Sequence, residues 1–240
     1  MLATVRMMYP ESFAQAPGLN ADVADPNVNK NWEAAGANVA AGVLGANGVL
    51  ATTAGADGDQ HIVTPHQDAD QSMIAVLEYR SNLHPDWDNI VSLATEAELP
   101  QFLVSGFKTT LDFDPTSDAD ALIFFFDLDD VATQPNWRFI ERIGGVVLAT
   151  VDTGIPVAAN TMQRLRIRFN DQQKAEILVG QGLGDLSLIH TTSVIPNTIT
   201  TWKPYFGVEQ ADDAVEFGYH KADIQIDPAL LPSAEPAPEV

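Results

Sequence analysis

Four closely spaced aspartates are the residues of this chain with the clearest potential for chemistry. They are Asp112, Asp114, Asp118 and Asp120. Hard cations such as Ca²⁺ prefer several carboxylate and carbonyl oxygens, so a calcium-binding loop is one interpretation. The stretch DFDPTSDAD lacks the glycine and the closing glutamate of an EF-hand loop, however. In an acidic chain a solvated turn shaped by Pro115 and Ser117 is the favoured alternative, and we expect no metal and no other cofactor.

The carboxylates and histidines of the chain show no catalytic arrangement. Glycoside hydrolysis needs two carboxylates about 5–10 Å apart across a groove. Glu141 falls in a predicted strand but has no carboxylate two residues further on. His66 lies near Asp68 and Asp70, but in a predicted loop, and no serine has a nucleophile-elbow sequence. We therefore predict no catalytic residues and no enzymatic activity.

One predicted strand carries a basic stripe. Its arginines, Arg164, Arg166 and Arg168, alternate with Leu165, Ile167 and Phe169. Because side chains of a strand alternate between its faces, the arginines share one face. Cross-strand pairing with acidic neighbours is the favoured interpretation. A docking surface for an acidic partner, including a second copy of the chain, is the alternative.

Residues 1–31 contain Pro10, Pro17 and Pro26 and show no useful apolar period. We predict an extended arm with little structure of its own. Such an arm is either free in solvent or lies on a neighbouring molecule, and five of its side chains are more apolar than a solvated tail needs, which favours the neighbour. They are Val5, Met7, Met8, Tyr9 and Phe13.

The composition limits the classes of partner. With 240 residues and 45% hydrophobic residues, the chain is long enough to form one main domain. It has no cysteine, which excludes disulfides and thiolate metal sites. Its net charge of −21 repels phosphate backbones, so we expect no nucleic acid partner. No apolar run approaches the roughly 20 residues needed to cross a bilayer, so we expect no membrane partner.

Short strands must position these residues. Strand patterns bounded by turn residues occur at 61–65, 72–80, 106–114, 121–128, 137–143, 146–154, 161–170, 174–180, 186–190, 202–209 and 215–226. Two further short strands are predicted around the tight-turn sequence Asn47-Gly48, with a helix over 33–41 as the competing interpretation. A short helix is predicted in the connection that contains Trp87, Ile90 and Val91, capped by Asp86 or Asp88.

The order of these segments resembles the concanavalin A-like jelly roll, the fold shared by legume lectins, pentraxins and laminin G-type domains. The resemblance rests on GFKTTLDFDPTSDADALIFFFDL, NWRFIERIGGVVLATVDTG, TMQRLRIRFN, KAEILVG and TWKPYFGVEQ, and it covers about residues 45–228. It implies an all-β sandwich of two antiparallel sheets at 32–227. The arm 1–31 precedes the sandwich, and a proline-rich tail, 228–240, follows it.

More narrowly, the sequence is similar to such domains in virion proteins of tailed bacteriophages. This similarity implies a virion structural protein, made in the host cytoplasm, that decorates or cements the capsid. Its expected partners are the major capsid protein and neighbouring copies of itself, as a homo-oligomer on the particle. The alternative is a lectin-like, carbohydrate-binding module of a tail fibre or host-recognition spike, with glycans as partners, and a polysaccharide hydrolase or lyase comes third. Since the fold hosts all of these roles, the fold alone does not choose among them.

Overall fold

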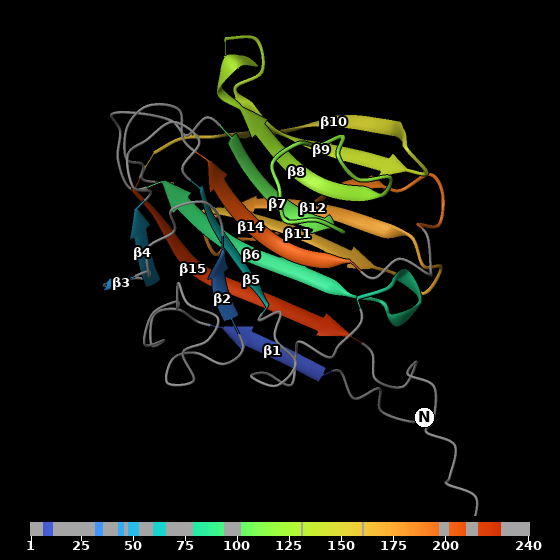
Figure 1. Cartoon of the computed structure of the whole chain (residues 1–240), viewed down its shortest axis with the longest axis horizontal. Coiled ribbons are helices and arrows are strands. Elements are labelled where there is room, and N and C mark those ends of the chain that lie inside the picture. The colour runs from blue at the N-terminus through green and yellow to red at the C-terminus, as the bar shows by residue number, and fades with distance from the viewer. Residues whose placement is uncertain are drawn as a thin grey trace, which may run out of the picture.

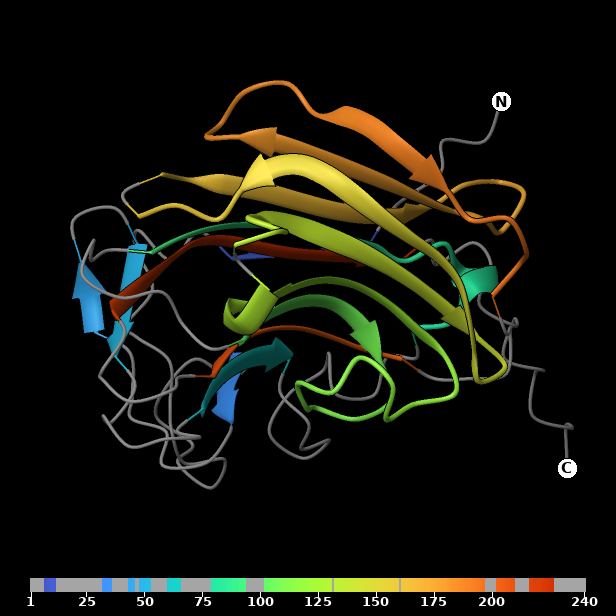
Figure 2. The same cartoon turned by 90° about the horizontal axis from the view of Figure 1, so that it is seen from above.

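The structure is a computed structural model that describes residues 7–11, 32–35, 43–45, 48–52, 60–65, 79–93, 102–130, 132–159, 161–196, 202–209 and 216–226. These residues form two antiparallel β-sheets, which pack face to face as a sandwich (Figures 1 and 2). The predicted all-β architecture is confirmed. Among the described residues, no helix is long and apolar enough to cross a membrane.

The first sheet has eight strands. Its spatial order is β13 (Ser187–Thr191), β12 (Ala175–Gln181), β11 (Gln163–Phe169), β6 (Asp86–Leu93), β15 (Glu216–Ile226), β4 (Gly48–Thr52) and β3 (Val43–Gly45), and β1 (Met7–Glu11) also pairs with β15. The second sheet has seven strands. Its order is β10 (Val146–Pro156), β9 (Asn136–Ile143), β8 (Ala121–Asp127), β7 (Phe102–Lys108), β14 (Lys203–Glu209), β5 (Gln60–Pro65) and β2 (Trp32–Ala35).

The core lies between the two sheets. In β11 the apolar residues Leu165, Ile167 and Phe169 are buried, as their alternation with the arginines predicts. Trp87, Trp137 and Trp202 are also buried, and the core further contains Phe107, Phe124, Phe126, Phe139 and Phe206. The packing role that is common for tryptophan therefore applies to these three, rather than sugar stacking at an exposed surface.

Polar side chains connect the two sheets across this core. Trp87 of β6 donates its indole N–H to Ser105 Oγ of β7 over 3.1 Å. Trp137 of β9 donates to Gln163 Oε1 of β11 over 2.6 Å. Each bond satisfies a buried donor and fixes one sheet relative to the other.

The prediction of a short helix in this connection is wrong. Asp86–Leu93 instead forms strand β6, which lies between β11 and β15. The misleading signal came from Asp86 and Asp88, which resemble helix caps in sequence. Both are buried and pair with arginines of β11, so tertiary pairing overrides the local pattern. The only helical elements among the described residues are single 3₁₀ turns at Ser81–Leu83 and Leu128–Asp130.

Other sequence expectations are met or shifted. The hairpin at Asn47-Gly48 is confirmed, since β3 and β4 pair antiparallel with Gly45 opposite Gly48, and Trp32–Ala35 is a strand rather than a helix start. The strand expected at 106–114 instead begins at Phe102 and ends at Lys108. In the arm, Met7–Glu11 pairs with β15 of the same chain. Of the strand predicted at 72–80, only Tyr79 and Arg80 are described, and Tyr79 forms an isolated bridge with Trp202. The remaining arm residues and the tail lie outside the described residues.

Candidate functional site

A groove lies on the outer face of the seven-stranded sheet, opposite to the core. Its volume is about 590 Å³, within the range of ligand pockets. Strands β7, β8, β9, β10 and β14 form its floor, and the loop 109–120 between β7 and β8 forms one wall. The lining residues are Phe102, Phe113, Asp114, Pro115, Phe125, Asp127, Asp130, Arg138, Ile140, Thr150 and Glu209.

Two aromatic rings form the centre of the floor. Phe102 of β7 and Phe125 of β8 stack with their ring centroids 5.9 Å apart and an interplanar angle of 24°. The guanidinium carbon of Arg138, from β9, lies 5.5 Å from the centroid of the Phe125 ring. This arrangement combines flat apolar surface with one cationic donor over its face.

Arg138 is held by one carboxylate and retains an unused donor. Its Nη2 lies 3.1 Å from Asp130 Oδ2. Its Nε is buried and has no hydrogen-bond partner among the described residues. Buried donors in native proteins are almost always satisfied. The guanidinium thus lines the groove while it carries the cost of one unsatisfied, buried donor.

Carboxylates form the polar rim of the groove. Burial, and then the nearby charges of Asp130 and Asp129, raise the pKa of Asp127, although the Asp129 backbone N–H that it accepts opposes this shift. Glu209 accepts a hydrogen bond from the side-chain amide of Gln60. Because every one of these groups accepts hydrogen bonds, the rim suits a ligand rich in hydroxyl donors.

A second, smaller hollow of about 170 Å³ continues the groove along β9 and β10. Gln134, Asn136 and Asp152 line it, and it shares Arg138 and Thr150 with the first hollow. Asp152 accepts hydrogen bonds from the Asn136 amide and the Gly154 backbone N–H, which lower its pKa. The two hollows together make an elongated site, which fits a chain-like ligand better than a single compact one.

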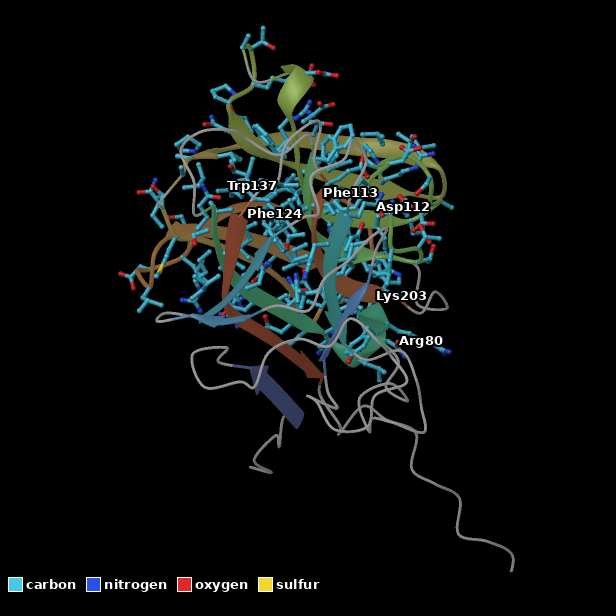
Figure 3. All side chains as sticks on the ribbon, turned by 60° about the vertical axis from the view of Figure 1, so that its left-hand side comes forward. Arg80, Asp112, Phe113, Phe124, Trp137 and Lys203 are labelled. Atoms are coloured by element: carbon cyan, nitrogen blue, oxygen red, sulfur yellow. The ribbon has the colours of Figure 1, made fainter. Side chains whose placement is uncertain are left out.

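The loop 109–120 is folded back onto the outer face of the sheet. Phe113 is buried against Gly207 of β14, where an added Cβ would come within 2.8 Å of the ring. Figure 3 shows Phe113 and Asp112 together, apart from the core residues Phe124 and Trp137. Phe113 also packs into a second apolar cluster with Val104, Phe125, Ile140 and Tyr205. The loop thus contributes a fixed wall to the groove.

The four aspartates considered for calcium all accept hydrogen bonds from donors of the protein itself. Asp112 pairs with the buried Lys108, and Asp118 accepts the backbone N–H groups of Thr109 and Thr110. Asp120 accepts the backbone N–H of Gly144, and Asp114 accepts that of Thr116. No group of three or more potential metal ligands occurs within the part of the chain that the structure describes.

The three arginines of the basic stripe lie on β11 and have acidic partners. Arg164 and Arg166 form bidentate pairs with Asp88 and Asp86 of β6, and Arg168 pairs with Glu176 of β12. This is the cross-strand pairing that the sequence favours. A docking role for the stripe, or for the arm residues Met7, Met8 and Tyr9, stays a prediction. Val5 and Phe13 lie outside the described residues, as does the cluster around His66.

Sequence reasoning missed the residues that form the groove, notably Phe102, Phe125, Arg138 and Thr150. One signal was present in ALIFFFDL, which is apolar at both strand faces instead of alternating. A strand of this kind is covered on its outer face as well as its inner one. Here the outer cover is the loop 109–120, with the groove beside it.

Comparison with known proteins supports the fold. No protein-family model and no curated protein matches the sequence. A protein of unknown function from Shewanella oneidensis MR-1 is similar in structure, with a TM-score of 0.60 and 8% identity over 98% of this chain and 92% of that one. The carbohydrate recognition domain of Emp47p gives a TM-score of 0.57 with 10% identity, over 87% of this chain and 94% of its own. Peanut lectin gives 0.56 with 8% identity, over 92% and 97%. The chain therefore has the concanavalin A-like jelly-roll fold of the legume lectins.

Proposed function

We propose that this protein is a non-catalytic carbohydrate-binding module and that the groove on the seven-stranded sheet holds its glycan. The observation that carries the proposal is the stacked pair Phe102–Phe125, with Arg138 over the Phe125 ring, inside a groove with a carboxylate rim. The fold gives indirect support, because peanut lectin and the carbohydrate recognition domain of Emp47p share it, although a shared fold does not by itself establish a shared function.

The groove offers each kind of contact that a sugar needs. The apolar C–H face of a pyranose ring packs on an aromatic ring, and the half-buried Phe102, stacked against the buried Phe125, supplies that surface. Sugar hydroxyls donate hydrogen bonds to the carboxylates of Asp127 and Glu209. The guanidinium of Arg138, which lines the groove, donates to a hydroxyl or ring oxygen. The second hollow extends this set of contacts to a neighbouring sugar.

The test is a groove-blocking substitution at an exposed position. Thr150 is exposed on β10 and lines both hollows, so Thr150→Trp fills the groove without disturbing the core. Thr191→Trp, at an exposed position of β13 in the other sheet, is the matched control. Glycan-array screening of the wild type identifies a ligand, and calorimetry then compares the three proteins. We expect Thr150→Trp to weaken binding by about tenfold or more and Thr191→Trp to leave it unchanged.

Two results would overturn the proposal: no glycan bound on the array, or equal affinity in the two tryptophan variants. A hydrolase or lyase is a second candidate, because several carboxylates line the groove and Asp127 has a raised pKa. Against it, Asp130 is engaged by Arg138 and Glu209 by Gln60. Release of reducing ends from a bound glycan by the wild type, and not by Asp127→Asn, would establish the enzyme instead. The capsid-decoration role stays a prediction from the sequence, as does location in a virion.

A further inference from the structure

A lysine is fully buried beneath the acidic loop. Lys108 is the last residue of β7, and its side chain is completely enclosed. A buried ammonium is costly unless its three donors are satisfied by close partners. Here the ammonium donates to the carboxylate of Asp112, to the backbone carbonyl of Asp114 over 2.5 Å and to Ser117 Oγ over 2.7 Å.

The three partners match the three donors in number and in kind. The three oxygens come from positions 112, 114 and 117 of one loop, and the carboxylate and the backbone carbonyl are kinds of oxygen with which loops surround a hard cation. Burial raises the pKa of Asp112, but the hydrogen bonds from Lys108, Thr110 and Ser117 outweigh burial and leave that pKa below its ordinary value. The carboxylate is therefore ionised at neutral pH and the loop closes around an internal positive charge.

This internal charge acts on the groove through Phe113. Lys108 holds an oxygen of Asp112 and an oxygen of Asp114, the two residues that flank Phe113. Phe113, Asp114 and Pro115 are the loop residues that line the groove. A further bond, from the Tyr205 hydroxyl to the Asp112 carbonyl over 2.6 Å, fixes the same turn to β14.

We propose that Lys108 is the positioning residue of the glycan groove: its ammonium takes the place of a bound cation in the loop 109–120 and holds Phe113 in the groove wall. Glycan binding at this wall then needs no divalent cation. The glycan-binding part of this inference rests on the proposed function. The conformation of the loop is measured separately, in the absence of glycan.

The first experiment measures the loop alone. Chymotrypsin cleaves after phenylalanine, and the rate of cleavage between Phe113 and Asp114 is followed by mass spectrometry. Lys108→Met removes the charge and keeps the apolar stem, so we expect cleavage at least about tenfold faster, because the segment opens more often. Ser117→Ala removes one of the three oxygens at an exposed position and should give a smaller increase.

Lys203→Met is the matched control. Lys203 lies directly opposite Lys108 in the register of β14 and β7, is partly exposed, and forms no ion pair within the described part of the chain. We expect Lys203→Met to leave the rate of cleavage after Phe113 unchanged. Equal rates in wild type and both loop variants would overturn the inference, even if glycan binding is confirmed.

The second experiment uses chemical rescue. Lys108→Ala leaves a space for propylammonium, which replaces the missing methylenes and ammonium, whereas 1-propanol has the same length without the charge. We expect propylammonium, and not 1-propanol, to restore both slow cleavage at Phe113 and the glycan affinity. The affinity of the wild type should be unchanged by EDTA. Loss of affinity in EDTA, reversed by Ca²⁺, or equal rescue by both additives would contradict the role of the ammonium.

Discussion

At the level of single residues, the groove contains groups whose chemistry is unfavourable for the free protein. Arg138 Nε is buried without a partner in the described structure, and Asp127 is a carboxylate with a raised pKa beside two other aspartates. Such groups reduce stability, and binding sites are where proteins retain them. A ligand that accepts from the Arg138 guanidinium and donates to Asp127 offsets part of these costs.

Asp127→Asn separates stability from binding. Because burial and its acidic neighbours raise the folded-state pKa of Asp127, its ionised form is disfavoured in the folded protein. This destabilisation is absent at pH values below the pKa of the aspartate in the unfolded chain, near 3.9. It grows as the pH rises and is complete above the pKa of Asp127 in the folded protein. We expect Asp127→Asn to raise the melting temperature by about 1–3 °C at pH 7 and to leave it unchanged at pH 3.

The same variant should bind glycan less tightly, by about 3- to 10-fold, because a neutral amide oxygen is a weaker acceptor than a carboxylate. Asp171→Asn, at an exposed turn between β11 and β12, is the control for removing one negative charge. A lower melting temperature of Asp127→Asn at pH 7 would show that the ionised carboxylate does not destabilise the folded protein. A glycan affinity equal to that of the wild type would show that Asp127 does not bind the glycan.

At the level of the strands, side-chain hydrogen bonds through the core fix the position of one sheet on the other. Gln163 of β11 is buried and accepts from Trp137 of β9, and its own amide donates to the Pro156 carbonyl at the end of β10 over 2.7 Å. Because β9 and β10 carry Arg138 and Thr150, this bond also sets the position of the groove floor.

Gln163→Leu should therefore destabilise the protein by about 1–3 kcal/mol, because it leaves the buried Trp137 N–H without its acceptor. Urea denaturation measures this change. Gln172→Leu, in the exposed turn that precedes β12, makes the same substitution at the surface and should change the free energy of unfolding by no more than about 0.5 kcal/mol. Equal effects at the two positions would show that the hydrogen bond contributes nothing.

The strands differ in how far the sequence could predict them. Strand β11 was predictable because Leu165, Ile167 and Phe169 alternate with charged residues, and the β3–β4 hairpin because Asn47-Gly48 specifies a tight turn. Strand β6 was not, since its buried aspartates are explained only by arginines some 76 to 80 positions later in the chain. The groove was not predictable either, because Phe102, Phe125 and Arg138 come from three strands, and sequence spacing does not record which strands are neighbours.

At the level of the whole molecule, the charge distribution predicts which glycans the proposed site would accept. The chain carries a net charge of −21, and Asp114, Asp127, Asp130 and Glu209 add negative charge directly at the groove. The one arginine in the lining is already paired with Asp130. A glycan that carries uronic acid, sialic acid or sulfate groups therefore meets repulsion both on approach and in the site.

We expect neutral oligosaccharides to bind with an affinity that changes little between low and high salt. Acidic oligosaccharides of the same length should bind more weakly at low salt, with the difference narrowing as salt is added, because the Debye length falls from about 30 Å at 0.01 M to about 10 Å at 0.1 M. Calorimetry with a matched neutral and acidic pair measures both affinities. Acidic glycans that bind tightly at low salt and are released by added salt would instead indicate a basic site, and the groove described here would not be the glycan site.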